Sequence, residues 1–258
     1  MKKSIDFSTY SSIHIGQPEN VLIINRGDKI PSESYLVGGA NNLLISPTPP
    51  PLIMLSKEFA YIKQIDENTL EIGAAMPTGR IISYTKKHNI SGFEFCAKLP
   101  GTLGGMLAMN AGVKEYEVFN ILHSIEIDGK WVHKDDIDHG YRFAKLGGIA
   151  TAARFEKKSA FNQSLLEVLM KLRDNQPKEP SAGSVFKNPK EDSAGRLIEL
   201  VGLKGYHDGG MSWSELHANF LVNKGNGTYE EAINLIKLAK KKVFDRFGIV
   251  LEEEIKII

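Results

Sequence analysis

The organisation of this chain is decided by residues 181–189, Ser-Ala-Gly-Ser-Val-Phe-Lys-Asn-Pro. Pro180 and Pro189 restrict the residues before them, so we expect a rigid extended segment here rather than a helix. The small residues let a ligand approach the backbone closely, and the polar ones offer a hydroxyl, an ammonium and an amide. The structural alternative is a tight turn in which the Ser184 hydroxyl binds its own backbone.

Length and charge bound what the chain can do. With 258 residues, 42% of them hydrophobic and 24% charged, it can bury a real core and divide into two or three lobes. Its 32 Lys and Arg residues almost cancel its 31 Asp and Glu residues, so no general field attracts nucleic acid or an acidic membrane. We therefore expect a small anionic ligand that is gripped locally, with no obligatory protein partner.

Cys96 is the only cysteine, which excludes an intrachain disulfide and a cysteine-rich zinc site. The seven histidines show no metal-ligand spacing, so we expect no metal. No run approaches the ~18 apolar residues of a membrane span, and the N-terminus lacks the apolar core of a secretion signal. The sequence predicts a cytoplasmic protein.

The first glycine cluster reads Gly-Gly-Ala-Asn-Asn at residues 38–42, between the short apolar runs of a strand-rich lobe. Its backbone N–H groups can converge on a phosphate because no large side chain blocks them. A Rossmann fingerprint would open a helix, but Leu-Leu-Ile at 43–45 and four prolines within 47–51 follow here. We reject the Rossmann interpretation.

The second glycine cluster covers residues 99–112, where Thr102 and Asn110 are the polar exceptions among small and apolar side chains. This composition suits backbone wrapped against a large flat ligand and its diphosphate. A helix beginning at 103–105 would add amide donors and a positive dipole end. The structural alternative is close packing of a helix through its glycines.

Other patterns predict an α+β arrangement. Strands are expected at 69–73, 149–155 and 219–223, a hairpin at 121–133 around Asp128-Gly129, and helices from Pro77, at 165–172, at 195–202 and from the Thr228 capping box to Gly248. A final strand over 249–258 would place Glu254 and Lys256 on one face. Arg142, between two aromatic residues, is either a surface side chain stacked on a ring or a planar cation held for a carboxylate.

The order of the motifs is more specific than any single one. Together, the motifs of residues 10–257 resemble those of the UDP-N-acetylenolpyruvoylglucosamine reductase family. The motifs that carry this resemblance are Gly-Gly-Ala-Asn-Asn-Leu-Leu at 38–44, Pro-Gly-Thr-Leu-Gly-Gly at 100–105 with Asn-Ala-Gly at 110–112, Gly-Tyr-Arg at 140–142, Gln-Pro at 176–177 with residues 181–189, His-Ala-Asn-Phe-Leu-Val-Asn at 217–223, and Leu-Glu-Glu-Glu-Ile-Lys at 251–256.

The resemblance implies an FAD enzyme that uses NADPH to reduce UDP-N-acetylglucosamine enolpyruvate to UDP-N-acetylmuramate, a peptidoglycan precursor. It implies a two-lobed FAD-binding domain of the vanillyl-alcohol-oxidase/PCMH type followed by a C-terminal α+β substrate-binding domain. The small FAD lobe would be residues 1–56 joined by 249–258, the second lobe 57–160, and the substrate domain 161–248. Few residues separate Arg142 from Ile149, so the chain resembles the compact form without the tyrosine-bearing lid.

The resemblance also implies roles for residues. Arg142, Ser184 and Glu254 are the expected catalytic set: the guanidinium stabilises charge on the substrate carboxylate, and Ser184 protonates the carbanion that hydride transfer leaves. Tyr141, Lys187 and Asn188 are expected to bind substrate. The expected FAD contacts are Gly38, Gly39, Ala40, Asn41, Asn42, Leu43, Pro100, Gly101, Thr102, Gly104, Gly105, Asn110, Ala111, Gly112 and Lys256.

The chain departs from the family at three places: Lys256 replaces an arginine and loses its bidentate fork, Ala40-Asn41 replaces Gly-Ser, and Ala144 replaces a serine. Two other functions stay open, an FAD alcohol oxidase or dehydrogenase and a nucleotide-binding module without catalysis. A serine hydrolase is discounted, because Ser184 lacks a Gly-x-Ser-x-Gly elbow.

Overall fold

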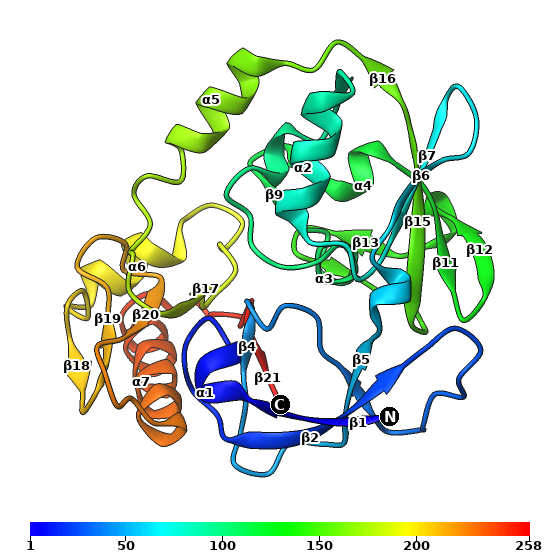
Figure 1. The fold of residues 1–258 in the computed structure, drawn as a ribbon. Helices are drawn as coiled ribbons and strands as arrows, with labels where there is room; N and C mark the ends of the chain where they lie inside the picture. The colour runs from blue at the N-terminus through cyan, green and yellow to red at the C-terminus, as the bar shows by residue number, and fades with distance from the viewer. The chain divides into compact units, whose positions relative to one another are not determined.

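The structure, a computed structural model, describes residues 1–258 except for the side chain of Ser159. The chain folds into two compact units (Figure 1). Unit 1 comprises Met1–Lys3, Val21–Gly39 and Pro51–Asp174, and unit 2 comprises Ser4–Asn20, Ala40–Pro50 and Asn175–Ile258. Helices and mainly antiparallel sheets occur in both, which confirms the α+β class. The predicted division into three lobes stays a prediction.

Unit 1 is built on a five-stranded antiparallel sheet of order β12-β11-β15-β7-β6. Its strands are β12 (Lys130–His133), β11 (Leu122–Ile127), β15 (Ala150–Glu156), β7 (Thr69–Gly73) and β6 (Ile62–Gln64). The predicted strands at 69–73 and 149–155 and the predicted hairpin are confirmed. Asp128 and Gly129, at φ 47° and 77°, supply the two left-handed residues that a type I′ turn requires.

Helices cover one face of this sheet (Figure 1). The α-helices of unit 1 are α2 (Thr78–Lys87), α3 (Leu103–Ala108), α4 (Val118–Ile121) and α5 (Gln163–Lys171), and its 3₁₀ turns are η1 (Lys57–Phe59), η2 (Glu94–Cys96) and η3 (Lys134–Asp136). Ile81, Leu103 and Val118 from three of these helices share one buried cluster with the sheet residues Ile72 and Phe155. Apolar residues at helical spacing therefore have a sheet to pack on.

A second group of strands in unit 1 is parallel. Strand β5 (Leu52–Leu55) pairs with β2 (Pro18–Ile24) and with β3 (Tyr35–Leu36), in the register Ile23 to Met54 and Leu36 to Ile53. These are the apolar runs that the sequence indicated. The remaining short elements before residue 160 are β1 (Lys2–Asp6), α1 (Phe7–Tyr10), β8 (Ile90–Ser91), β9 (Gly112–Val113), β10 (Tyr116–Glu117), β13 (His139–Gly140), β14 (Phe143–Ala144) and β16 (Lys158–Ser159).

Unit 2 holds a four-stranded antiparallel sheet of order β17-β20-β19-β18, with α7 beside it (Figure 1). Its elements are β17 (Ser181–Ser184), α6 (Ala194–Leu200), β18 (His207–Asp208), β19 (Met211–Trp213), β20 (Phe220–Asn223) and α7 (Tyr229–Phe247), together with β4 (Leu43–Leu44) and β21 (Lys256–Ile257). Trp213 and Phe186, both fully buried, stack at 6.0 Å between ring centroids in its core.

The signals for α7 are all local, and the structure confirms them. Thr228 accepts a hydrogen bond from the Glu231 amide at 3.2 Å, and the Glu231 carboxylate accepts one from the Thr228 amide at 3.0 Å. Gly248 ends the helix in the left-handed conformation at φ 68°. Among the helices of residues 1–258, none is both long and apolar enough to cross a membrane.

The predicted strand over 249–258 is too long. Only Lys256–Ile257 forms a strand, β21, which pairs in parallel with β4. Earlier in the segment, Glu253 forms an isolated antiparallel bridge with Phe186. The segment changes partner between these two pairings, so alternation in the sequence overstates how regular it is.

We predict that Cys96 is inert in the native protein. It is buried in η2 with 1% of its surface exposed, and burial, followed by the charge of Glu94, raises the pKa of its thiol. Because the thiolate is the reacting form, native protein at about pH 8 should not react with a dithiobis-nitrobenzoate reagent, and one equivalent should react after unfolding. Rapid reaction of the native protein would contradict this.

Candidate active site

The stretch 181–189 is extended at its start, as predicted. Strand β17 pairs with β20 at Ser181 to Val222 and at Ser184 to Phe220, and the register shifts between these two pairs. Gly183, at φ 80°, lies in this irregularity. Such bulges re-aim the side chain beside them, and here that side chain is Ser184. Pairing in the sheet replaces the alternative of a tight turn.

The C-terminal segment lies against this stretch within unit 2. The Glu254 amide donates to the Val185 carbonyl at 2.8 Å, and the Lys187 amide donates to the Glu252 carbonyl at 2.9 Å. Two of the three predicted catalytic residues, Ser184 and Glu254, therefore stand at one backbone pairing although 70 positions separate them in the sequence numbering (254 − 184 = 70).

Lys187 and Asn188, predicted to bind substrate, make contacts within unit 2. The Lys187 ammonium is 2.5 Å from a Glu252 carboxylate oxygen, and 15% of its side chain is exposed. Asn188 Oδ1 accepts a hydrogen bond from the Ala194 amide at 3.1 Å, at the first residue of α6. Asn188 thus helps to satisfy the start of a helix, a structural role that the sequence did not indicate.

Part of the first glycine cluster belongs to the same unit. Asn42 Nδ2 donates to the Glu254 carbonyl at 3.0 Å, and the Lys256 amide donates to the Asn42 carbonyl at 2.9 Å. Predicted cofactor residues Asn42, Leu43 and Lys256 are therefore held together with Glu254, because β4 and β21 pair there. Ala40 stands at φ 49°, the left-handed region that favours glycine.

Gly38 and Gly39 belong to unit 1, where Gly38 meets the second glycine cluster. A Cβ atom added to Gly38 would lie 2.8 Å from Thr102 Oγ1, so only glycine fits at this approach. The loop continues into β4 and not into a helix, as the rejection of a Rossmann motif requires. Two predicted cofactor segments far apart in the sequence therefore touch.

The amides at the start of α3 are already engaged, which corrects an expectation. Leu103 N–H donates to the Met76 carbonyl at 3.0 Å and Gly104 N–H to the Ala74 carbonyl at 2.8 Å. A Cβ atom on Gly104 would lie 3.2 Å from the same Ala74 oxygen. Close packing, the structural alternative, explains Gly104, because the helix lies against the segment after β7. The amide of Gly105 is bonded too, at 3.4 Å from Thr102 Oγ1.

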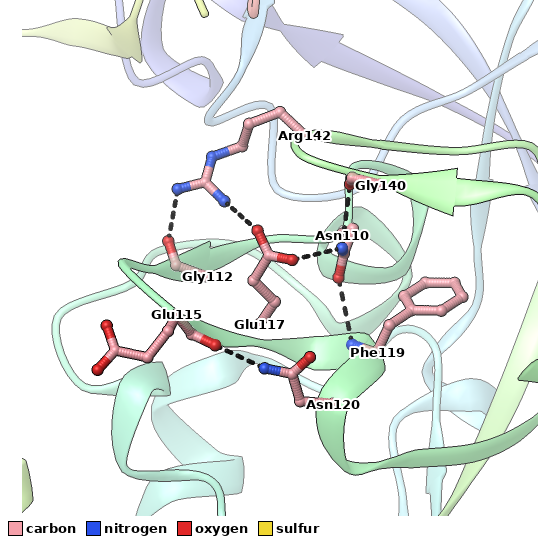
Figure 2. A network of polar contacts seen from close by, with 8 residues as sticks. All are labelled: Asn110, Gly112, Glu115, Glu117, Phe119, Asn120, Gly140 and Arg142. Carbon is pink, nitrogen blue, oxygen red and sulfur yellow. Dashed lines mark hydrogen bonds and ion pairs between the residues drawn. The ribbon is translucent and has the colours of Figure 1, made fainter. Parts of the chain in front are cut away.

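Arg142 lies in the two-residue loop between β13 and β14, at φ 60°. Its Nη2 donates to the Gly112 carbonyl at 2.9 Å, and its Nη1 is 3.4 Å from Glu117 Oε1 (Figure 2). Only 14% of its side chain is exposed, so most of it is shielded from solvent. Tyr141, with 44% of its surface exposed, faces the guanidinium at 5.0 Å from its ring centroid.

Asn110 links the second glycine cluster to this loop. It is 1% exposed, and its Nδ2 donates to Glu117 Oε2 at 2.8 Å and to the Gly140 carbonyl at 3.0 Å (Figure 2). Its Oδ1 accepts from the Phe119 amide at 3.2 Å. A predicted cofactor residue is thus bonded to the acid that pairs with Arg142. Ala111 and Gly112 follow directly, and Pro100 and Gly101 precede α3.

Sequence reasoning missed two charged residues of unit 1. Glu117 was not distinguished from the other 30 of the 31 acids, because no motif marks it. Burial, followed by the nearby charge of Arg142, lowers the pKa of Arg173. The charge of Arg142 therefore acts on Arg173 as well as on Glu117.

A pocket of about 520 Å³ also lies in unit 1. Glu94, Glu115, Glu117 and Asn120 are among its lining residues, and the predicted cofactor and substrate residues are not. Its acidic walls disfavour a phosphate group, so we do not assign the nucleotide to it.

The chain is similar along its whole length to known proteins. Residues 176–258 match the family model described as UDP-N-acetylenolpyruvoylglucosamine reductase, C-terminal domain. The chain is 50% identical to the UDP-N-acetylenolpyruvoylglucosamine reductase of Helicobacter hepaticus, over 98% of each chain, and 43% identical to that of Helicobacter pylori strain 26695, over 100% of this chain and 99% of the relative. The crystal structure of UDP-N-acetylenolpyruvylglucosamine reductase from Thermus caldophilus is similar with a TM-score of 0.86 and 26% identity, over 100% of this chain and 98% of that one.

Proposed function

Because the chain belongs to the UDP-N-acetylenolpyruvoylglucosamine reductase family, it is an oxidoreductase, and we propose that it reduces UDP-N-acetylglucosamine enolpyruvate to UDP-N-acetylmuramate. FAD is the bound cofactor and NADPH the reductant, and the product serves peptidoglycan synthesis in the cytoplasm. The observation that supports the proposal is the backbone hydrogen bond from Glu254 to Val185, the residue that follows Ser184 in unit 2.

The residues present fit FAD. Gly38 and Thr102 bring the two glycine clusters into contact in unit 1, so that one ligand would reach the backbone of both. Residues 1–56 with 249–258 form the proposed small lobe and 57–160 the second lobe of the vanillyl-alcohol-oxidase type, with Ala40, Asn42 and Lys256 among the cofactor contacts. When bound, FAD would supply the hydride-transfer chemistry that the reduction needs.

The chain's own residues stabilise the charge on the substrate carboxylate and supply the proton for the carbanion. Arg142 presents a planar cation to the substrate carboxylate, which gains further negative charge when hydride addition leaves a carbanion on the neighbouring carbon. Ser184 gives its hydroxyl proton to the carbanion carbon and regains a proton from solvent, so the step balances. Glu254 orients the intermediate.

Substrate binding falls to the C-terminal part of the chain. Residues 161–248 form the proposed substrate domain, and Lys187, Asn188 and Tyr141 are the proposed substrate-binding residues. Only residues 145–149 connect β14 to β15, so no long insertion supplies a lid at this point. This is the compact form of the family.

The visible spectrum tests the proposal. We expect purified protein to be yellow, and to oxidise NADPH only after the enolpyruvyl nucleotide is added. The proposal would be wrong if the purified protein were colourless and added FAD did not change its rate of NADPH oxidation. Flavin reduction by a sugar alcohol would favour the alcohol oxidase, and tight UDP-sugar binding without flavin turnover would favour a binding module.

A further inference from the structure

We propose that Glu117 is a positioning residue, which holds the Arg142 guanidinium in the orientation in which it binds the substrate carboxylate. This inference rests on the proposed function, since it assumes that Arg142 acts on substrate. Glu117 itself contacts neither substrate nor the reacting atoms. It acts through Arg142.

The contacts of Glu117 support this role because its two carboxylate oxygens serve two different donors. Oε1 is 3.4 Å from Arg142 Nη1, and Oε2 accepts a hydrogen bond from Asn110 Nδ2 at 2.8 Å (Figure 2). The Asn110 side chain is fixed in turn by the Gly140 carbonyl and the Phe119 amide. The mobile end of Arg142 is thereby tied to a buried amide.

The backbone conformation of Arg142 and the charge of Arg173 are two reasons why the Arg142 guanidinium needs an anchor. Arg142 occupies the left-handed region at φ 60°, which costs a residue with a side chain free energy and persists only when its surroundings fix it. Its charge also acts on Arg173, whose pKa is lowered by burial and then by Arg142. A carboxylate beside Arg142 offsets the repulsion between these two cations.

The geometry requires a carboxylate rather than an amide. Two donors face Glu117, one on Arg142 and one on Asn110, and a carboxylate accepts from both. Glutamine has one oxygen and one NH₂ group, so one of the two contacts becomes donor against donor. Glu117→Gln should therefore break the contact with either Arg142 or Asn110, without changing the size of the side chain.

Glu115→Gln is the matched control. Glu115 precedes Glu117 by two residues, is exposed, and points its carboxylate away from Arg142 (Figure 2). Both substitutions remove one negative charge from the same segment. A general electrostatic effect would therefore appear in both variants, whereas the loss of a specific contact appears only in Glu117→Gln.

The kinetic test follows the two half-reactions of FAD-loaded protein separately by stopped flow. For Glu117→Gln we expect flavin reduction by NADPH to be unchanged and reoxidation by the enolpyruvyl nucleotide to slow about 10-fold. In an Arg142→Lys background the same substitution should add less than about 2-fold, since residues that act as a unit are not additive. Equal slowing in both backgrounds, or in Glu115→Gln, would overturn the proposal.

A second readout needs no substrate. The guanidinium N–H signals of Arg142, identified by their loss in Arg142→Lys, should shift in NMR spectra of Glu117→Gln and stay in place in Glu115→Gln. Unshifted signals in Glu117→Gln would refute the anchor directly. If the parent protein lacked acceptor-dependent turnover, the proposed function would fail, and this spectrum alone would decide whether Glu117 holds Arg142.

Discussion

Ser184→Ala should keep FAD and lose roughly 10²–10⁴-fold in the rate at which the enolpyruvyl nucleotide reoxidises reduced flavin, the range for loss of a positioned proton donor. Gly183 at φ 80° lies at the register shift of β17 just before Ser184, so the backbone sets the direction of the Ser184 hydroxyl. Stopped-flow absorbance of pre-reduced protein mixed with the nucleotide measures this rate.

Ser181→Ala provides the comparison for this variant. Ser181 lies in the same strand on the other side of the register shift, so its loss tests for damage to β17 alone. Ser184→Cys, which retains a proton donor at the same position, should recover part of the lost rate. Unchanged turnover in Ser184→Ala would remove Ser184 from the mechanism.

Arg142→Lys should slow the same reoxidation step by about 10²-fold, the lower range for removal of one group that stabilises developing charge. Lysine keeps the charge but cannot offer two parallel N–H donors to a carboxylate. It also cannot contact the Gly112 carbonyl and Glu117 together as the guanidinium does. Flavin reduction by NADPH and FAD content should match the parent protein.

Arg80→Lys controls for the general effect of replacing an arginine in unit 1. Arg80 is exposed on α2, and we expect its replacement to leave both half-reactions unchanged. A parental reoxidation rate in Arg142→Lys would show that charge alone suffices, and the role of the planar fork would then be wrong.

Local signals account for what the sequence predicted well. Helix α7 carries its capping box and its terminal glycine within its own residues, and the hairpin carries Asp128-Gly129 at its turn. The extended form of β17 follows from the flanking prolines. The α+β class followed because these local elements were placed correctly.

Tertiary contacts account for what the sequence could not predict. The α3 amides were expected to be open, but the carbonyls of Ala74 and Met76 come from a segment that only the fold brings near. The sequence left two environments open for Arg142, and its half-buried position depends on contacts with Gly112 and Glu117. The catalytic roles themselves came from the resemblance of motif order, and they stay predictions.

The burial of Cys96 simplifies the site-specific labelling of this enzyme for energy-transfer measurements. Its only native thiol is shielded in η2, so a cysteine introduced at an exposed position can take a fluorescent dye without removing the native residue. One dye-bearing position in each unit would make a donor and acceptor pair. Energy transfer between them would then report, in single molecules, how the units respond when nucleotide is added.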